Sequence, residues 1–318
     1  MLNCAILDDY QECSLDFADW ASLKDVTLQP FTKFMEPEVL AKELQDFEII
    51  IAMRERTTFN AKLLESLPKL KLLVTTGMKN SAIDMDAAKQ HGIAVCGTKS
   101  LPYPAPELTW GLLFAIMRQI PMEVASLRSG GWQTQIGVGL NGKTLGIVGL
   151  GHIGKQIAKV AQALEMSVLA WQPKIKEDEC KAAGVECASS LDDLMRRSDA
   201  VTIHMVLADS TKGMIGAHEL SLMKPTAFLV NAARGPLVDE EALVQALKEN
   251  RIAGAALDVF DTEPLPADHP FRTLPNVIAT PHLGYVTREN YDVFYSEALE
   301  DIKCWQDGTP LRSLSEPK

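Results

Sequence analysis

Three features are missing or scarce in this 318-residue sequence, and each excludes a class of protein. It has no apolar run near the roughly 18 residues that a membrane-spanning helix needs. Its amino terminus has neither a basic region nor a long apolar stretch, so we expect no export signal. Basic residues are scarce: 31 Lys and Arg against 42 Asp and Glu give a net charge of −11, which repels nucleic acids and anionic membranes. We therefore expect a small-molecule partner.

The six cysteines form no Cys-x-x-Cys pair and no metal-ligand spacing. Scattered cysteines of this kind are typical of reduced thiols in a cytoplasmic protein. We therefore expect a cytoplasmic location, no metal, and reduced thiols at all six positions, which are Cys4, Cys13, Cys96, Cys180, Cys187 and Cys304.

The chain is about twice the usual length of one domain, which favours two domains. Short apolar or β-branched runs alternate with segments of helical period, the pattern of parallel sheets covered by helices. Two series of strands are expected: residues 4–7, 48–53, 70–75 and 93–96, and then residues 144–149, 167–171, 200–204, 227–231, 254–259 and 277–280.

Residues 101–120 contain three prolines followed by a strongly apolar helix, which separates the two series of strands. Residues 289–305 have helical spacing and follow the last strand, so we expect them to return to the first domain. We predict an α/β protein in which residues 1–100 and 286–318 form one domain, and residues 101–285 form a second, inserted one.

The segment Leu-Gly-Ile-Val-Gly-Leu-Gly-His-Ile-Gly at residues 145–154 ends a predicted strand and begins an amphipathic helix. Gly149 permits the tight turn, Gly151 lets the backbone approach a pyrophosphate, and Gly154 allows the helix to pack closely on the strand. His152 and Ile153 lie in the first helical turn, whose N–H groups attract an anion. This pattern in this context predicts a dinucleotide site, with an ordinary tight turn as the alternative.

The next predicted strand ends in Gln172, at the place where an NAD enzyme carries an acid for the ribose 2′-hydroxyl. Lys174 follows two residues later. The missing carboxylate and the nearby cation favour NADP over NAD. The alternative is that Gln172 still binds the ribose of NAD while the lysine is solvated.

Three polar residues each follow a different strand of the second series. They are Arg234, Glu263 and His282, and ligands of open α/β sheets bind at the carboxyl ends of strands. Reduction of a 2-oxo acid needs a cation for the carboxylate, an acid for the carbonyl oxygen, and a partner that keeps that acid charged. These three side chains match those needs.

At these residues the sequence resembles the D-isomer-specific 2-hydroxyacid dehydrogenase family, in its glyoxylate/hydroxypyruvate reductase-like branch. The resemblance covers nearly the whole chain and rests on the glycine turn, Asn-x-x-Arg-Gly at Arg234, Leu-Asp-Val-Phe-x-x-Glu-Pro at Glu263, and Thr-Pro-His-Leu-Gly at His282. It implies a Rossmann-type dinucleotide-binding domain inserted into a flavodoxin-like substrate-binding domain.

The resemblance also implies residue roles. His282 would be the general acid/base, with Glu263 as its hydrogen-bonded partner and Arg234 as the substrate anchor. Asp258 would face the nicotinamide carboxamide. Residues near His204 and Ala232 would line the cofactor, and a homodimer would be the usual assembly.

The substrate is less well defined by the sequence. Gly77-Met78-Lys79 looks like the family loop whose backbone N–H groups hold the substrate carboxylate, although Lys79 stands where a second glycine is frequent. Arg54 follows a predicted strand and is a candidate for a substrate carboxylate or phosphate, with a solvated charge as the alternative. Met78, Tyr103 and Tyr285 predict an apolar pocket for a small unphosphorylated side chain.

These observations predict hydride transfer between NAD(P) and a small 2-oxo acid or D-2-hydroxy acid. A formate dehydrogenase would carry glutamine in place of Glu263. A regulatory phosphoglycerate dehydrogenase would add a C-terminal sensing domain, whereas this chain stops about 40 residues after the last predicted strand. A dinucleotide-sensing scaffold of the corepressor type is the alternative from another class, and turnover would exclude it.

Overall fold

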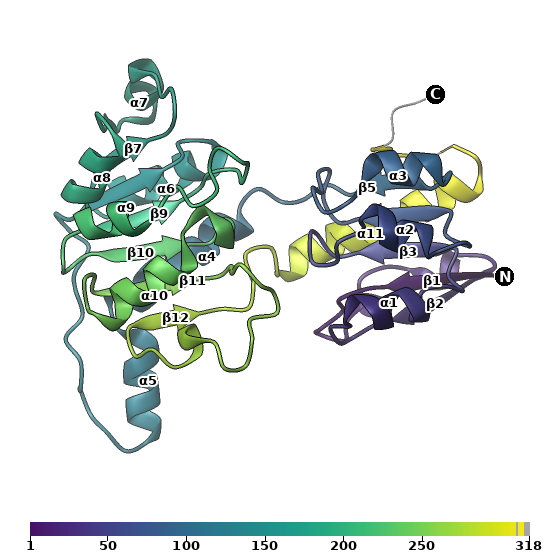
Figure 1. Ribbon diagram of the computed structural model, residues 1–318, viewed down its shortest axis with the longest axis horizontal. Coiled ribbons are helices and arrows are strands. Elements are labelled where there is room, and N and C mark those ends of the chain that lie inside the picture. Colours follow the sequence, from purple (N-terminus) through teal and green to yellow (C-terminus); the bar gives the residue numbers. More distant parts are fainter. Residues whose placement is uncertain (310, 315–318) are drawn as a thin grey trace. The chain divides into compact units, whose positions relative to one another are not determined.

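The structure, a computed structural model, describes residues 1–309 and 311–314. It divides the chain into two compact units, one made of Met1–Leu101 with Val286–Lys318 and the other of Pro102–Tyr285 (Figure 1). Each unit is built on its own parallel sheet, which confirms the predicted α/β class. None of the helices in these described ranges is both long and apolar enough to span a bilayer.

The first unit contains a five-stranded sheet with the order β2-β1-β3-β4-β5. This is the flavodoxin-like order, in which the chain changes direction across the sheet between β1 and β3. The strands are β1 (Leu2–Ile6), β2 (Val26–Pro30), β3 (Ile49–Ala52), β4 (Leu72–Thr75) and β5 (Ala94–Gly97). The helical elements are η1 (Ser14–Asp16), η2 (Trp20–Ser22), α1 (Pro37–Glu43), α2 (Ala61–Glu65), α3 (Met85–Gln90) and α11 (Arg288–Gln306).

Helix α11 belongs to the first unit although it follows every strand of the second in sequence. It packs against β4 and β5, and it buries Tyr291, Phe294 and Tyr295. Its start is fixed by Thr287, whose side chain accepts a hydrogen bond from the backbone N–H of Asn290. The helix predicted at residues 289–305 is therefore confirmed.

The second unit contains a seven-stranded sheet with the order β12-β11-β10-β9-β6-β7-β8. From β8 to β11 this is the order of a dinucleotide-binding sheet, with the change of direction between β6 and β9. The strands are β6 (Thr144–Val148), β7 (Ser167–Trp171), β8 (Glu186–Cys187), β9 (Ala200–Ile203), β10 (Phe228–Asn231), β11 (Gly254–Leu257) and β12 (Val277–Ala279).

Helices cover this sheet, and the apolar α4 lies against α6, β10 and β11. The helical elements are α4 (Pro104–Met117), α5 (Ile120–Arg128), α6 (His152–Ala163), α7 (Glu177–Ala183), α8 (Leu191–Arg197), α9 (Ala217–Leu222), η3 (Gly235–Leu237), α10 (Glu240–Lys248) and η4 (Pro270–Arg272).

The prediction that all six cysteines are reduced is wrong for Cys180 and Cys187, which form a disulfide. Helix α7 ends at Gly184, whose φ of 66° turns the chain back along the sheet edge. That turn brings the two Cα atoms to 5.8 Å, although the residues are seven apart in sequence. The pairing depends on this helix-to-strand turn, which no cysteine spacing motif indicates.

Candidate active site

The turn between β6 and α6 has the geometry that a dinucleotide pyrophosphate needs. Gly149 has a φ of 104°, in the left-handed region that favours glycine, and a Cβ there would lie 2.7 Å from the carbonyl oxygen of His204. A Cβ at Gly154 would lie 2.1 Å from the carbonyl oxygen of Gly149. These two glycines therefore allow the helix and the neighbouring strand to pack directly on the turn.

Gly151 has a different environment, because a Cβ at this position would meet no atom within 4 Å. It precedes α6, whose first turn contains His152 and Ile153. The first backbone N–H groups of a helix have no acceptor within the helix and carry its positive dipole end. The open approach at Gly151 and these N–H groups fit a bound pyrophosphate.

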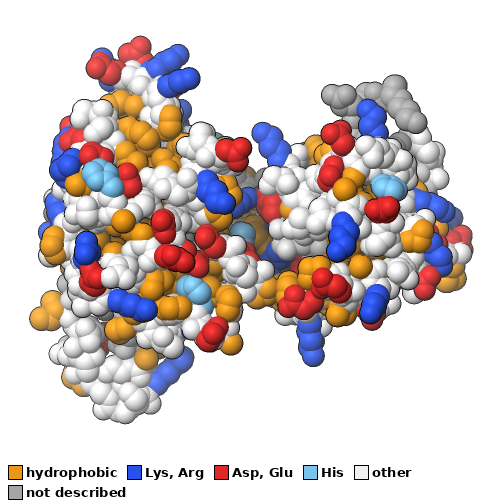
Figure 2. Space-filling view, in the orientation of Figure 1, with side chains coloured by type: hydrophobic (Ala, Val, Ile, Leu, Met, Phe, Trp, Pro, Cys, Tyr) orange, Lys and Arg blue, Asp and Glu red, His pale blue; other side chains and the backbone are white. Residues whose placement is uncertain are grey.

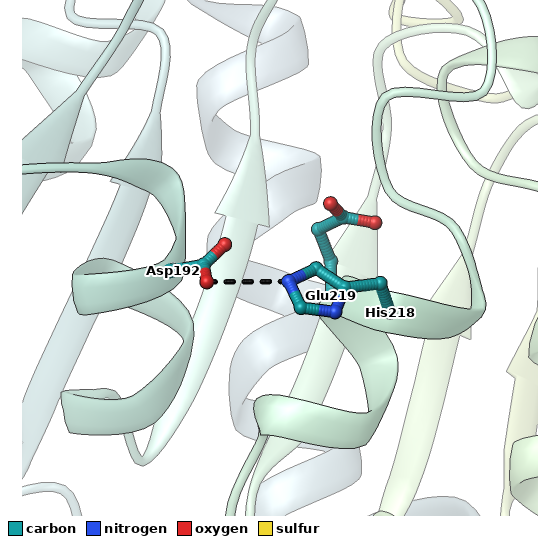
Figure 3. Close-up of side chains that lie close together, drawn as sticks. All are labelled: Asp192, His218 and Glu219. Carbon is teal, nitrogen blue, oxygen red and sulfur yellow. Dashed lines mark hydrogen bonds and ion pairs between the residues drawn. The ribbon is translucent and has the colours of Figure 1, made fainter.

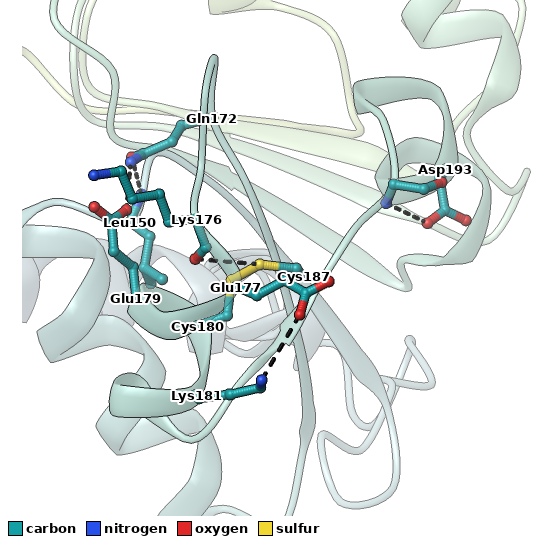
Figure 4. Close-up of a disulfide and its surroundings, with 10 residues drawn as sticks. Leu150, Gln172, Lys176, Glu177, Glu179, Cys180, Lys181, Cys187 and Asp193 are labelled. Carbon is teal, nitrogen blue, oxygen red and sulfur yellow. Dashed lines mark hydrogen bonds and ion pairs between the residues drawn. A yellow bond between two sulfur atoms is a disulfide. The ribbon is translucent and has the colours of Figure 1, made fainter.

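Gln172 follows β7 and makes a hydrogen bond at each end of its amide (Figure 4). Its Oε1 accepts from the backbone N–H of Leu150 at 3.0 Å, and its Nε2 donates to Oε2 of Glu179 at 3.3 Å. The sequence reasoning named Gln172 and the exposed Lys174 but missed Glu179. The acid lies on α7, seven residues beyond Gln172, the position at which a ribose-binding carboxylate is sought.

His204 and Ala232 follow the neighbouring strands β9 and β10. Burial lowers the pKa of His204 to about 3, so its imidazole is neutral at neutral pH. Its Nε2 lies 3.0 Å from Oγ1 of Thr202, and its backbone N–H donates to the carbonyl of Val148 at the end of β6. His204 therefore forms part of the wall of the glycine turn.

Arg234 lies in a short loop after β10 whose shape is fixed by Asn231. The Nδ2 of Asn231 donates to the carbonyl oxygen of Arg234 at 2.9 Å, and its Oδ1 accepts from the N–H of Ala233 at 3.1 Å. The next residue, Gly235, packs so closely that a Cβ there would lie 2.1 Å from the carbonyl carbon of Phe260. The Arg234 loop is thus seated directly on the loop that leads to Glu263.

His282 and Glu263 meet through a short hydrogen bond. The Nδ1 atom of His282 lies 2.6 Å from Oε2 of Glu263, while Oε1 of Glu263 accepts from the backbone N–H of Phe260 at 3.0 Å. An ionised carboxylate only accepts hydrogen bonds, so this bond requires a proton on Nδ1. His282 also has a φ of 56°, in the left-handed region that residues other than glycine adopt uncommonly.

Asp258 holds the backbone of the His282 loop. Its Oδ1 accepts from Oγ1 of Thr280 at 2.6 Å and from the N–H of Leu283 at 2.7 Å, and its Oδ2 accepts from the N–H of Gly284 at 2.8 Å. Burial raises the pKa of Asp258, while these hydrogen bonds act in the opposite direction. The family resemblance predicts Asp258 beside the cofactor, but the sequence does not indicate this set of contacts or Thr280 within it.

The candidate substrate residues of the first unit lie at the carboxyl ends of β3 and β4. Arg54 donates from its backbone N–H to Oγ1 of Thr76 at 2.9 Å and from Nη1 to the carbonyl of Thr76 at 3.3 Å. A Cβ at Gly77, whose φ is 104°, would lie 1.9 Å from Nη1 of Arg54. Glycine therefore leaves room for the guanidinium beside the loop, in which Met78 and Lys79 are exposed.

A group that the sequence reasoning did not single out is formed by Asp192, His218 and Glu219 (Figure 3). The Nε2 of His218 lies 3.2 Å from Oδ2 of Asp192, and their side chains are 63% and 37% exposed. Glu219 already accepts from the backbone N–H of Gly216 at 2.8 Å, which caps α9. The group lies at the starts of two short helices, with His218 exposed and the two acids partly buried.

Residues 110–284 match the family described as D-isomer specific 2-hydroxyacid dehydrogenase, NAD binding domain. The chain is 39% identical over 269 residues to the D-3-phosphoglycerate dehydrogenase of Methanocaldococcus jannaschii, covering 84% of this chain and 51% of that protein. It is 37% identical over 286 residues to the glycerate dehydrogenase of Methylorubrum extorquens, covering 86% of this chain and 87% of that protein. This chain therefore spans about half the length of the phosphoglycerate dehydrogenases that it matches.

A solved structure gives the same result for the fold. The phosphoglycerate oxidoreductase of Vibrio cholerae O395 superposes with a TM-score of 0.93 at 33% identity, covering 97% of this chain and all of that one. Its similarity extends over both units. The family resemblance expected from the sequence is thereby confirmed.

Proposed function

Because the chain belongs to the D-isomer specific 2-hydroxyacid dehydrogenase family, we propose that it transfers a hydride between a nicotinamide cofactor and a small 2-oxo acid or D-2-hydroxy acid. The observation that carries this proposal is the 2.6 Å hydrogen bond between His282 and Glu263. It joins an acid/base pair at the carboxyl ends of β11 and β12, in the unit that contains the dinucleotide turn.

The proton chemistry follows from this bond. The nicotinamide, when bound, supplies or accepts the hydride. With Nδ1 committed to Glu263, His282 exchanges a proton with the substrate oxygen at Nε2, giving it in the direction of 2-oxo acid reduction and taking it in the direction of hydroxy acid oxidation. The carboxylate of Glu263 stabilises the imidazolium and fixes the orientation of the ring.

Arg234 is the group we assign to the substrate carboxylate. A guanidinium offers a planar pair of donors that matches a carboxylate, and it also polarises the adjacent carbonyl. The bond from Asn231 to the carbonyl of Arg234 holds the base of this side chain in place. In the other unit, we assign Arg54 and the backbone N–H groups of Met78 and Lys79 to contacts with the same class of substrate.

The cofactor is NAD(H) or NADP(H), with a preference for NADP(H). The pyrophosphate is assigned to Gly149, Gly151 and Gly154, and His204, Ala232 and Asp258 are assigned to the nicotinamide half. Acceptance of a 2′-phosphate is supported by Gln172, which replaces a strand-end carboxylate, and by the cation of Lys174. Glu179, which contacts Gln172, opposes that preference.

We also propose a homodimer. Helix α5 points away from the sheet of its own unit (Figure 1), and no side chain of this helix is buried. The exposed apolar side chains of α5 and the segment after it are Ile120, Val124, Leu127, Trp132 and Ile136. A second copy that covers this set would remove it from water. A Trp132→Ser, Leu127→Ser double variant should shift the mass measured by light scattering to that of a monomer.

The partners we propose are small molecules rather than nucleic acids or membranes. On the face shown in Figure 2, acidic and basic side chains are interspersed. We assign the protein to the cytoplasm, although disulfides are rare in that compartment and Cys180 and Cys187 form one.

The proposal is tested by steady-state kinetics with glyoxylate, hydroxypyruvate, pyruvate and phenylpyruvate, each with NADH and with NADPH. We expect saturable oxidation of the reduced cofactor with at least one of these acids. Binding of cofactor without turnover of any of the four acids would refute the proposed reaction. It would indicate a sensing protein on the same fold.

A further inference from the structure

We propose that Glu179 limits the preference of this protein for NADP over NAD. This inference rests on the proposed use of a nicotinamide cofactor. The observation behind it is the chain of hydrogen bonds from the glycine turn through Gln172 to Glu179: Leu150 N–H to Gln172 Oε1 at 3.0 Å, and Gln172 Nε2 to Glu179 Oε2 at 3.3 Å.

The amide of Gln172 places a carboxylate near the position that a strand-end acid would occupy. In a dinucleotide fold the end of the second strand faces the adenosine ribose, and an acid there accepts a hydrogen bond from the 2′-hydroxyl. Here a neutral amide, Gln172, follows that strand, β7, and the negative charge comes from the following helix, α7. A carboxylate beside a bound ribose would accept a hydrogen bond from its 2′-hydroxyl and would repel a 2′-phosphate.

The helix that carries Glu179 is cross-linked to the sheet. Cys180, the next residue, is buried and forms the disulfide with Cys187 on β8 (Figure 4). Strand β8 in turn pairs with β7, with Cys187 opposite Ala170, two residues before Gln172. The carboxylate is therefore held at a defined place relative to the strand end instead of moving with an open loop.

Lys174 and Lys176 lie between Gln172 and Glu179 in sequence, so the effect of Glu179 on a 2′-phosphate depends on the balance between its negative charge and their positive charges. Lys174 is exposed beyond the strand end, and Lys176 points toward Gln172 and Glu179 in Figure 4. Glu177 lies on the same helix but pairs with Lys181, with its side chain 83% exposed. Removing the charge of Glu179 leaves both lysines available to a 2′-phosphate, whereas removing the charge of Glu177 does not alter the contacts of Gln172.

The test compares Glu179→Gln with Glu177→Gln, which makes the same substitution two residues away on one helix. Isothermal titration calorimetry measures the dissociation constants of adenosine 2′,5′-bisphosphate and of 5′-AMP, which share the adenosine and differ in the 2′-phosphate. We expect Glu179→Gln to increase the preference for the bisphosphate by about tenfold, and Glu177→Gln to change it by less than about twofold. The ratio of kcat/KM with NADPH to kcat/KM with NADH should rise in parallel.

An unchanged ratio of the two dissociation constants in Glu179→Gln, with both nucleotides still bound, overturns this inference and leaves the proposed function standing. Equal changes in the two glutamine variants also overturn it, because they would reflect net charge alone. If neither nucleotide nor NAD binds the unmodified protein, the proposed cofactor site is wrong and this inference fails with it.

Discussion

The imidazole of His282 and the carboxylate of Glu263 are joined by a 2.6 Å hydrogen bond although 19 residues separate them in sequence. They come from loops that follow β11 and β12, which are paired neighbours in the sheet. The Glu263 loop is braced by the backbone N–H of Phe260, and the His282 loop is held by Asp258. These contacts fix the orientation of the pair, which an acid/base group needs.

The first prediction concerns Glu263→Gln. Glutamine keeps the shape but removes the charge that stabilises the imidazolium, so His282 should lose its proton at lower pH. The alkaline limb of the rate of 2-oxo acid reduction should move to lower pH by about one unit or more, as measured in a pH profile of kcat/KM. Asp192→Asn, which breaks an exposed pair with His218, is the control and should leave the limb unmoved. A profile that is the same in Glu263→Gln would show that the pair is not coupled.

The second prediction concerns Arg234→Lys. Lysine keeps the positive charge but loses the planar pair of donors, so KM for the 2-oxo acid should rise and kcat should fall together. A loss of about tenfold to a hundredfold in kcat/KM is expected for one charge-assisted contact. Arg251→Lys is the matched control, since Arg251 is exposed and pairs with Glu249. Unaltered kinetics in Arg234→Lys would place this residue outside the substrate site.

The third prediction uses the burial of His204, which lowers its pKa to about 3 in the folded protein. In the unfolded chain this histidine takes up a proton near its ordinary pKa of about 6.5. Between these values unfolding binds a proton, so the free energy of unfolding decreases as the pH falls, by at most about 1.4 kcal/mol per pH unit. The contribution is complete above about pH 6.5 and is lost progressively toward pH 3.

His204→Asn removes this titration. Urea unfolding between about pH 6 and pH 4 should therefore show a shallower loss of stability in the variant than in the unmodified protein. His91→Asn, on the exposed end of α3, is the control and should keep the original slope. Equal slopes for the unmodified protein and His204→Asn would show that burial does not lower the pKa of His204 in the folded protein.

Features that depend on short segments were predictable from the sequence. The glycine spacing at Gly149, Gly151 and Gly154 specifies a strand, a tight turn and a helix, because Gly149 and Gly154 each meet a local steric demand and Gly151 leaves the start of the helix open. Most strands were also predictable, because buried parallel strands are continuous apolar runs. The edge strand β2 was missed because it is not a continuous apolar run and it ends at Pro30, and β8 was missed because it has two residues.

Features that depend on contacts between separate elements were not predictable. Asp258 and Gln172 were both named as cofactor residues, but the bonds from Asp258 to Leu283 and Gly284, and from Gln172 to Glu179, follow from how loops and helices meet in space. The Cys180–Cys187 bond was missed for the same reason, since only the turn at Gly184 brings the two residues together. The sequence spacing of these residues does not indicate any of these three sets of contacts.

The most direct test of the proposed reaction is the turnover of His282→Gln with a 2-oxo acid that the unmodified protein reduces, measured together with the dissociation constant of the cofactor. Loss of proton transfer should lower kcat by roughly 10²- to 10⁴-fold, while the dissociation constant of the cofactor changes by less than about twofold. Turnover close to that of the unmodified protein would contradict the assignment of His282 as the acid/base, and with it the central claim.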